Sequence, residues 1–193
     1  MSGNAFGTPP LDVMKVNFRH YSEKDSEEIQ SLFASVFGAS ESEAEGAVIG
    51  KLSKELLEKT EKNDLFVFVA SSGEEIKGAI FLTRMPSKKE NEIFLLAPVA
   101  VKTESQGQGI GQSLISYGIK ELKENGAKLL VTYGDPSFYS KVGFNQVEEK
   151  LIEPPFPLSQ PEGWLAQDLN GRHITASIGK CLCVPAFDNP KYW

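Results

Sequence analysis

Residues 95–111 of this 193-residue chain read LLAPVAVKTESQGQGIG: an apolar strand, a short loop with glycines at 107, 109 and 111, and the first turn of a helix. Such a loop gathers several backbone N–H groups at the positive end of a helix dipole. We therefore predict a binding site for a phosphate or pyrophosphate group. A second stretch, GDPSFYSKVGF at residues 134–144, follows after one helix and one strand and is predicted to belong to the same active half.

The composition excludes several classes of protein. Hydrophobic residues make up 40% of the chain, and Lys+Arg 20 against Asp+Glu 26 give a net charge of −6, which does not suit general nucleic-acid binding. No apolar run approaches the ~18 residues needed to span a membrane. Residues 1–15 lack a basic and then apolar secretory signal. We expect one cytoplasmic domain without nucleic-acid or membrane partners, and homodimer formation is left open.

The cysteine content predicts no metal site. Cys181 and Cys183 are the only cysteines, and they lack the nearby Cys or His pair that a zinc site needs. Neighbouring positions on one face of a strand rarely form a disulfide. We therefore expect two free thiols in a reducing compartment.

The hydrophobic pattern predicts an α/β domain with a mixed sheet. Pro98 interrupts one apolar strand, which indicates a bulge or splay that leaves backbone N–H and C=O groups free for a ligand. Strands are expected at residues 16–21, 65–70, 76–85, 92–101, 128–133 and 145–152, with further candidates at 164–169 and 180–185. Helices are expected from residue 22 or 25 to an end at Gly38, and at 42–62, 109–125 and 137–142.

The glycine loop does not match two common phosphate motifs. A dinucleotide fingerprint, G-x-G-x-x-G, fails because Gln112 stands three residues after Gly109 and Leu114 three after Gly111. A P-loop requires Gly-Lys-Ser/Thr, which is absent here. A plain turn without a ligand would not need three alternate glycines.

The remaining pattern, Gln106-x-x-Gly109-x-Gly111, resembles the acyl-CoA loop Q/R-x-x-G-x-G/A of the GNAT superfamily of N-acetyltransferases. The preceding APVAV resembles the splayed fourth strand of that family, and FYSKVGF at 138–144 resembles its F-Y-x-x-x-G-F motif. The whole of GDPSFYSKVGF is similar to the YhbS-like subgroup of bacterial predicted acetyltransferases. In element order the resemblance covers about residues 16–150.

The resemblance implies a fold and a division of the chain. The expected fold is α/β (α+β), with a mixed, mostly antiparallel sheet, a splayed central strand and helices on both faces. Residues 1–15 would be a flexible leader and 16–152 an acetyl-CoA-binding catalytic domain. Residues 153–193 would add strands that complete the same domain and the acceptor cleft.

The resemblance also implies a mechanism, in which acetyl-CoA is the cosubstrate and an amine attacks the thioester directly. Residues 106–111 would cradle the pyrophosphate, residues 99–101 would hydrogen-bond the pantetheine, and an N–H near Val99 would stabilise the oxyanion. Tyr139 would protonate the departing thiolate, while Phe138 beside it is the better candidate for core packing. The cofactor-binding residues implied are Val99, Ala100, Val101, Gln106, Gly107, Gln108, Gly109, Ile110, Gly111 and Phe138.

The general base is less clearly indicated. Glu92, at the start of the splayed strand, could act through water, although a solvated charge at the edge of a loop is the competing interpretation. His20 and His173 are the only histidines, and His20 lies in a strand-like segment. The loop departs from the family because Gln106 and Gln108 stand where many members have a basic residue. Residues 134–136, Gly-Asp-Pro, replace an asparagine that many members carry.

The acceptor amine is the main open point. Family members shape the acceptor cleft with their first helices and C-terminal strands, here residues 22–62 and 154–193. The acidic chain suits a cationic acceptor such as a polyamine, an amino sugar or a lysine side chain. Two alternatives remain: a catalytically weak acyl-CoA-binding sensor or partner subunit, and an enzyme using a longer acyl-CoA or an aminoacyl donor.

Overall fold

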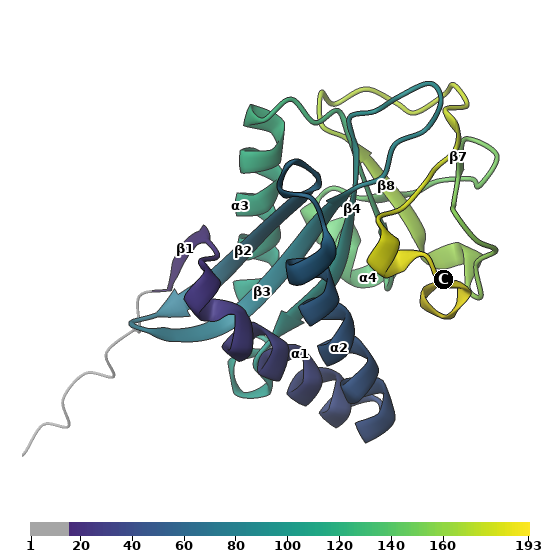
Figure 1. The fold of residues 1–193 in the computed structure, drawn as a ribbon. Helices are drawn as coiled ribbons and strands as arrows, with labels where there is room; N and C mark the ends of the chain where they lie inside the picture. The colour runs from purple at the N-terminus through teal and green to yellow at the C-terminus, as the bar shows by residue number, and fades with distance from the viewer. Residues whose placement is uncertain (1–15) are drawn as a thin grey trace, which may run out of the picture.

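The structure, a computed structural model, describes residues 16–193, so the predicted leader lies outside the described residues. Its centre is a seven-stranded sheet in the order β1-β2-β3-β4-β5-β8-β6, with helices on both faces (Figure 1). Every neighbouring pair is antiparallel except β4–β5, which confirms the expected mixed, mostly antiparallel sheet. The strands of the sheet are Asn17–His20 (β1), Leu65–Ser72 (β2), Glu75–Arg84 (β3), Ile93–Val101 (β4), Leu129–Tyr133 (β5), Asn145–Gln146 (β6) and Trp164–Asp168 (β8). The α-helices are Ser26–Ser40 (α1), Glu43–Lys59 (α2), Ile110–Glu124 (α3) and Pro136–Tyr139 (α4).

The two faces of the sheet carry different layers. Helix α3 covers one face, and its Gly118 lets it come close, since a Cβ there would stand 2.8 Å from Ile80 Cδ1. Helices α1 and α2 cover the other face together with the C-terminal segment (Figure 1). Phe187 and Trp193 of that segment are buried, and the Trp193 indole N–H donates to the carbonyl of Phe187 at 3.1 Å. These two aromatic side chains near the C-terminus therefore contribute to the core on the side of α1 and α2.

Strand β4 leaves its neighbour β5 halfway along. The two strands pair only at residues 93–95 with 129–131, so within residues 16–193 no strand pairs with the rest of β4 on that side. On its other side the register with β3 shifts between Ile80 and Leu82, opposite the segment that contains Pro98. The bulge and splay predicted from this proline are confirmed. The open wedge between β4 and β5 leaves backbone groups available at the carboxyl end of β4.

Three predicted boundaries were wrong. The strand at 145–152 is only β6 and a separate short strand, Ile152–Glu153 (β7), because the chain turns where Leu151 N–H bonds the carbonyl of Glu148. In place of the strand predicted at 180–185, the structure has the two-residue strand Gly179–Lys180 (β9), which pairs with β7. Helix α1 passes through Gly38 instead of ending there, because that glycine packs against Gly46 of α2.

The thiols behave as expected. Cys181 is buried and Cys183 half-buried, both are free, and burial raises their pKa to about 12 and about 11. They are therefore poor nucleophiles at neutral pH. Residues 16–193 hold no cluster of three or more His, Cys, Asp or Glu side chains that could bind a metal ion. In the same part of the chain, no helix has the length and apolar composition that crossing a membrane requires.

A buried carboxylate ties β1 to the start of α1 and makes stability depend on pH. Asp25 accepts hydrogen bonds at 2.7 and 3.0 Å from Arg19, and one at 2.7 Å from the N–H of Ser22. The hydrogen bond from Arg19 is the main reason that the pKa of Asp25 falls to about 2. Because the folded pKa is depressed, this stabilisation is present above the unfolded pKa and is lost as the pH falls from about 4 towards 2.

Asp25→Asn is expected to lower the free energy of unfolding by ~2 kcal/mol at pH 6. Denaturant titrations at pH 6, 4 and 2.5 measure the difference from wild type, which shrinks towards pH 2.5. Glu27→Gln, at an exposed position in the first turn of α1, is the control and changes stability by less than ~0.5 kcal/mol. A difference for Asp25→Asn that stays constant over this range contradicts the assignment.

Candidate active site

A cavity of about 680 Å³ lies at the carboxyl end of β4 and joins the two stretches singled out in the sequence. It brings together the splayed strand, the glycine loop and the FYSKVGF segment. The predicted site residues that line it are Val99, Ala100, Val101, Gln106, Gly107, Gly109, Ile110, Gly111, Phe138 and Tyr139. The remaining lining residues are Val36, Ser105, Gln112 and Lys141.

The backbone of β4 turns alternate polar groups toward this cavity. Along an antiparallel strand, the N–H and C=O of one residue point to the same side, and those of the next residue point to the other side. Lys102 N–H bonds the carbonyl of Lys77 on β3, so Ala100 faces β3 while Val99 and Val101 face away from it. The side-chain amide of Gln106 donates to the carbonyl of Val101 at 3.0 Å, in agreement with that orientation. An extended ligand could pair with this edge as an added strand would.

The N-terminus of α3 is left without a side-chain cap. Its N-cap residue, Gly109, is left-handed with φ 78°, and Gly107 has φ 74°, so both need glycine. By contrast, Ser42 caps α2 and Asp135 caps α4 through side-chain oxygens. The first turn of α3 carries no acidic residue either. Its free N–H groups and the helix dipole therefore make this end of the cavity suited to an anion.

Tyr139 lines the same cavity from the short helix α4. Its ring makes edge contacts with Phe138 and Phe144, at centroid distances of 5.0 and 5.7 Å. Burial around the hydroxyl raises the pKa of Tyr139 above its ordinary value, although a hydrogen bond with Thr132 opposes the shift. The phenol therefore keeps its proton throughout the neutral range. Thr132 also donates to the carbonyl of Leu96 at 2.8 Å, which places this contact where β4 and β5 separate.

Gly134 allows the tyrosine ring to sit where it does. A Cβ at this position would stand 2.7 Å from Tyr139 Cε2, so a larger residue would displace the ring. Gly134 also lines a smaller cavity of about 450 Å³ at the end of β5. That cavity is lined by Tyr133, Asp135, Pro136, Ser159, Gln160, Glu162 and Gly163 as well. Gly134 therefore contacts both the tyrosine ring and this second cavity.

Two predicted site residues do not line the main cavity. Glu92 lies just before β4, at the end of the strand opposite to the cavity, and pairs with Arg84 at 2.9 Å. This position does not support a role as general base. Gln108 belongs to the loop but is exposed and donates to the carbonyl of Glu104 at 3.3 Å. His20 is likewise elsewhere, beside Glu121 on the α3 side of the sheet.

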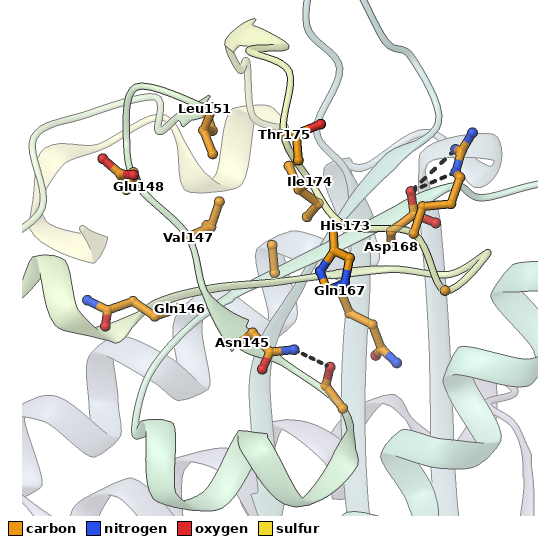
Figure 2. A pocket seen from close by; sticks show the side chains of 14 residues that line it. Asn145, Gln146, Val147, Glu148, Leu151, Gln167, Asp168, His173, Ile174 and Thr175 are labelled. Carbon is orange, nitrogen blue, oxygen red and sulfur yellow. Dashed lines mark hydrogen bonds and ion pairs between the residues drawn. The ribbon is translucent and has the colours of Figure 1, made fainter.

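His173 belongs to a different cavity, of about 660 Å³, on the outer side of β8 beside the short edge strand β6 (Figure 2). There Arg172 pairs with Asp168 at 3.3 Å, and the Asn145 side chain donates to the carbonyl of Gly143 at 3.4 Å. Gln167 Oε1 is buried there and has no hydrogen-bond partner among residues 16–193. This cavity mixes donors, acceptors and apolar groups without favouring one class of ligand.

Sequence reasoning missed four lining residues of the main cavity. Val36 comes from the apolar face of α1, so only the packing of that helix reveals it. Ser105 and Gln112 flank the glycine loop directly. Lys141 stands inside FYSKVGF, where its place in a recognised motif was the available signal.

Comparison with known proteins identifies the family to which this fold belongs. The family model described as "Acetyltransferase (GNAT) domain" matches residues 17–147. The chain is 29% identical over 180 residues to the uncharacterized N-acetyltransferase YjhQ of Escherichia coli K12. This alignment covers 90% of this chain and 95% of YjhQ.

Solved structures give the same result for the fold. The crystal structure of the GNAT family N-acetyltransferase YhbS from Escherichia coli, in complex with CoA, superposes with a TM-score of 0.78 at 25% identity, over 95% of this chain and 96% of that one. A GNAT family acetyltransferase from Brucella melitensis, in complex with acetyl-CoA, gives a TM-score of 0.71 at 22% identity over 91% and 99% of the two chains. The second likeness shows the fold alone.

Proposed function

The chain belongs to the GNAT acetyltransferase family, and from this premise we propose that it transfers the acetyl group of acetyl-CoA to an amine by direct attack. The observation that carries the proposal is the single cavity that unites an uncapped helix N-terminus, an unpaired strand edge and Tyr139. These three features supply, in order, a site for phosphates, a backbone edge for the pantetheine and a proton donor. The YhbS complex with CoA supports the choice of donor.

The proposed reaction assigns each group one task. N–H groups at the start of α3 bind the pyrophosphate, and the edge of β4 at Val99 and Val101 holds the pantetheine. A backbone N–H near Val99 stabilises the oxyanion that forms when the amine nitrogen attacks the thioester carbon. Such a donor typically lowers the barrier by ~3 kcal/mol. The amine attacks as the neutral base and gives up one proton to solvent as the amide forms. As the C–S bond breaks, Tyr139 gives its proton to the departing thiolate and then regains one from solvent.

Calorimetric titration with acetyl-CoA tests the donor site. Gly109→Trp is expected to weaken binding at least ~10-fold, because the indole enters the space where the phosphates bind. A Cβ at Gly109 would meet no atom within 4 Å, so the cost to the fold is the backbone strain of a residue other than glycine at φ 78°. Gly73→Trp is the matched control: Gly73 also has positive φ and an open Cβ direction, but it lies in the β2–β3 turn. A folded wild type that does not bind acetyl-CoA would remove the proposed function.

The acceptor is proposed to be a cationic amine that enters through the smaller cavity beyond Gly134. Two carboxylates line that cavity, Asp135 and Glu162. The carboxylate of Asp135 accepts two hydrogen bonds from Ser137. Glu162, in contrast, forms no ion pair among residues 16–193. A panel of polyamines, amino sugars, lysine peptides and neutral amines tests this, with Glu162→Gln raising KM for cationic acceptors alone. Turnover of only neutral or anionic amines would contradict it.

A further inference from the structure

The main cavity contains very little charge for a site that is to hold a polyanion. Among the described residues that line it, Lys141 alone has a charged side chain. The loop itself presents Gln106, which is neutral, and Gln108 is neutral and turned to Glu104. With a net charge of −6, the chain as a whole does not attract anions. Any positively charged contact to the phosphates of acetyl-CoA must therefore come from a side chain at the cavity itself.

Other lysines near this end of β4 are already engaged. Glu75 accepts from Lys102 at 2.6 Å and from Lys77 at 2.7 Å. Lys141, in contrast, forms no salt bridge within 4 Å among residues 16–193. The nearby carboxylate of Asp135 is held by Ser137, through the backbone N–H at 2.8 Å and the hydroxyl at 2.7 Å. The ammonium group of Lys141 remains available to a ligand.

Local structure directs Lys141 to the cavity. Helix α4 continues into a 3₁₀ helix, Ser140–Val142, which ends at Gly143 with φ 94°. Phe138 anchors this segment against the first turn of α3, since its Cζ would lie 3.4 Å from a Cβ at Gly111. The same packing sets Lys141 at the wall of the cavity that also holds Gly107 and Gly109. The lysine and the glycine loop thus face one ligand volume from two elements.

We infer that Lys141 binds a phosphate group of the acyl-CoA and makes the site selective for phosphorylated donors over acylated pantetheine alone. This inference rests on the proposed function and extends it to a residue outside the glycine loop. The lysine supplies the positive charge that the two glutamines of the loop do not. A charge-assisted contact of this kind at an exposed lysine is expected to change affinity about tenfold.

The test compares Lys141→Met with wild type in calorimetric titrations of acetyl-CoA and of S-acetyl-pantetheine. The variant is expected to bind acetyl-CoA about tenfold more weakly and S-acetyl-pantetheine as wild type does. Lys141→Arg should restore acetyl-CoA binding. Lys123→Met is the charge-matched control, an exposed lysine at the other end of α3, ~20 Å along the helix from the loop.

The outcomes separate the two proposals. If wild type binds acetyl-CoA no better than Lys141→Met does, the role of Lys141 is overturned but the proposed function stands. The same conclusion follows if Lys141→Met loses affinity equally for acetyl-CoA and for S-acetyl-pantetheine. Wild type without affinity for acetyl-CoA overturns both. A titration with acetyl-dephospho-CoA, which lacks the 3′-phosphate, then locates the contact. If Lys141→Met still binds this ligand more weakly than wild type does, the lysine contacts the pyrophosphate; if the difference disappears, it contacts the 3′-phosphate. Either result supports the inference.

Discussion

Tyr139→Phe is expected to lower kcat by about 10²–10⁴-fold while leaving the Kd of acetyl-CoA nearly unchanged. The phenol oxygen is removed, but the ring keeps its edge contacts with Phe138 and Phe144. Burial raises the pKa of Tyr139 above its ordinary value, so the wild-type acid stays protonated throughout the neutral range. As a proton donor it fails only when the pH rises above that pKa, so the wild-type kcat should show no loss attributable to Tyr139 in the neutral range.

Steady-state kinetics with an amine identified in the acceptor panel measure this effect, and calorimetry measures the affinity. Tyr117→Phe is the matched control, because Tyr117 is also half-buried with a raised pKa but lies on α3 against Phe18 and Phe68. Its kcat should stay within ~2-fold of wild type. Equal kcat for Tyr139→Phe and wild type would remove Tyr139 as the acid. Tight binding of acetyl-CoA without turnover in either protein would favour the acyl-CoA sensor.

The candidate site was predictable where its chemistry is local in the chain. Gly107 and Gly109 stand in the glycine loop that the sequence singled out, where both have positive φ, and Tyr139 follows in a motif of fixed length. Pro98 indicated the splay because a proline removes one donor from the ladder, whichever strands lie beside it. The same reasoning failed for Glu92. Its partner Arg84 lies on β3, and only the observed strand pairing brings the two charges to 2.9 Å.

The fold was less accessible where it depends on contacts between distant segments. Periodicity indicated a strand at 164–169, but it did not indicate that β8 would enter the sheet between β5 and β6. Likewise, Gly38 has the chemistry of a helix end, yet α1 continues through it. The reason lies in α2, whose Gly46 packs against the backbone of α1 so closely that a Cβ at Gly46 would stand 2.8 Å from the Cα of Gly38. Close approach of two backbones leaves no local pattern that a single helix would reveal.

Gly46→Ala tests that close approach through the sign of its effect on stability. In an isolated helix the change is expected to stabilise by ~1 kcal/mol, because alanine is the better helix former. Here the added Cβ would overlap the carbonyl oxygen of Ala34 and stand 2.8 Å from the Cα of Gly38, and both are backbone atoms that cannot rotate away. We expect a loss of ~3 kcal/mol in the free energy of unfolding, measured by denaturant titration, as α1 and α2 are forced apart.

The same variant is also expected to bind acetyl-CoA less well, because Val36 of α1 lines the main cavity, where we propose that acetyl-CoA binds. Separation of the helices would move that wall, so the folded fraction of Gly46→Ala is expected to bind acetyl-CoA ~3-fold or more weakly than wild type. Ala47→Gly, at the exposed neighbouring position on α2, calibrates helix propensity and should cost ~1 kcal/mol without changing affinity. If Gly46→Ala instead stabilises the protein, the two helices do not pack backbone to backbone, and Val36 owes its position to other contacts.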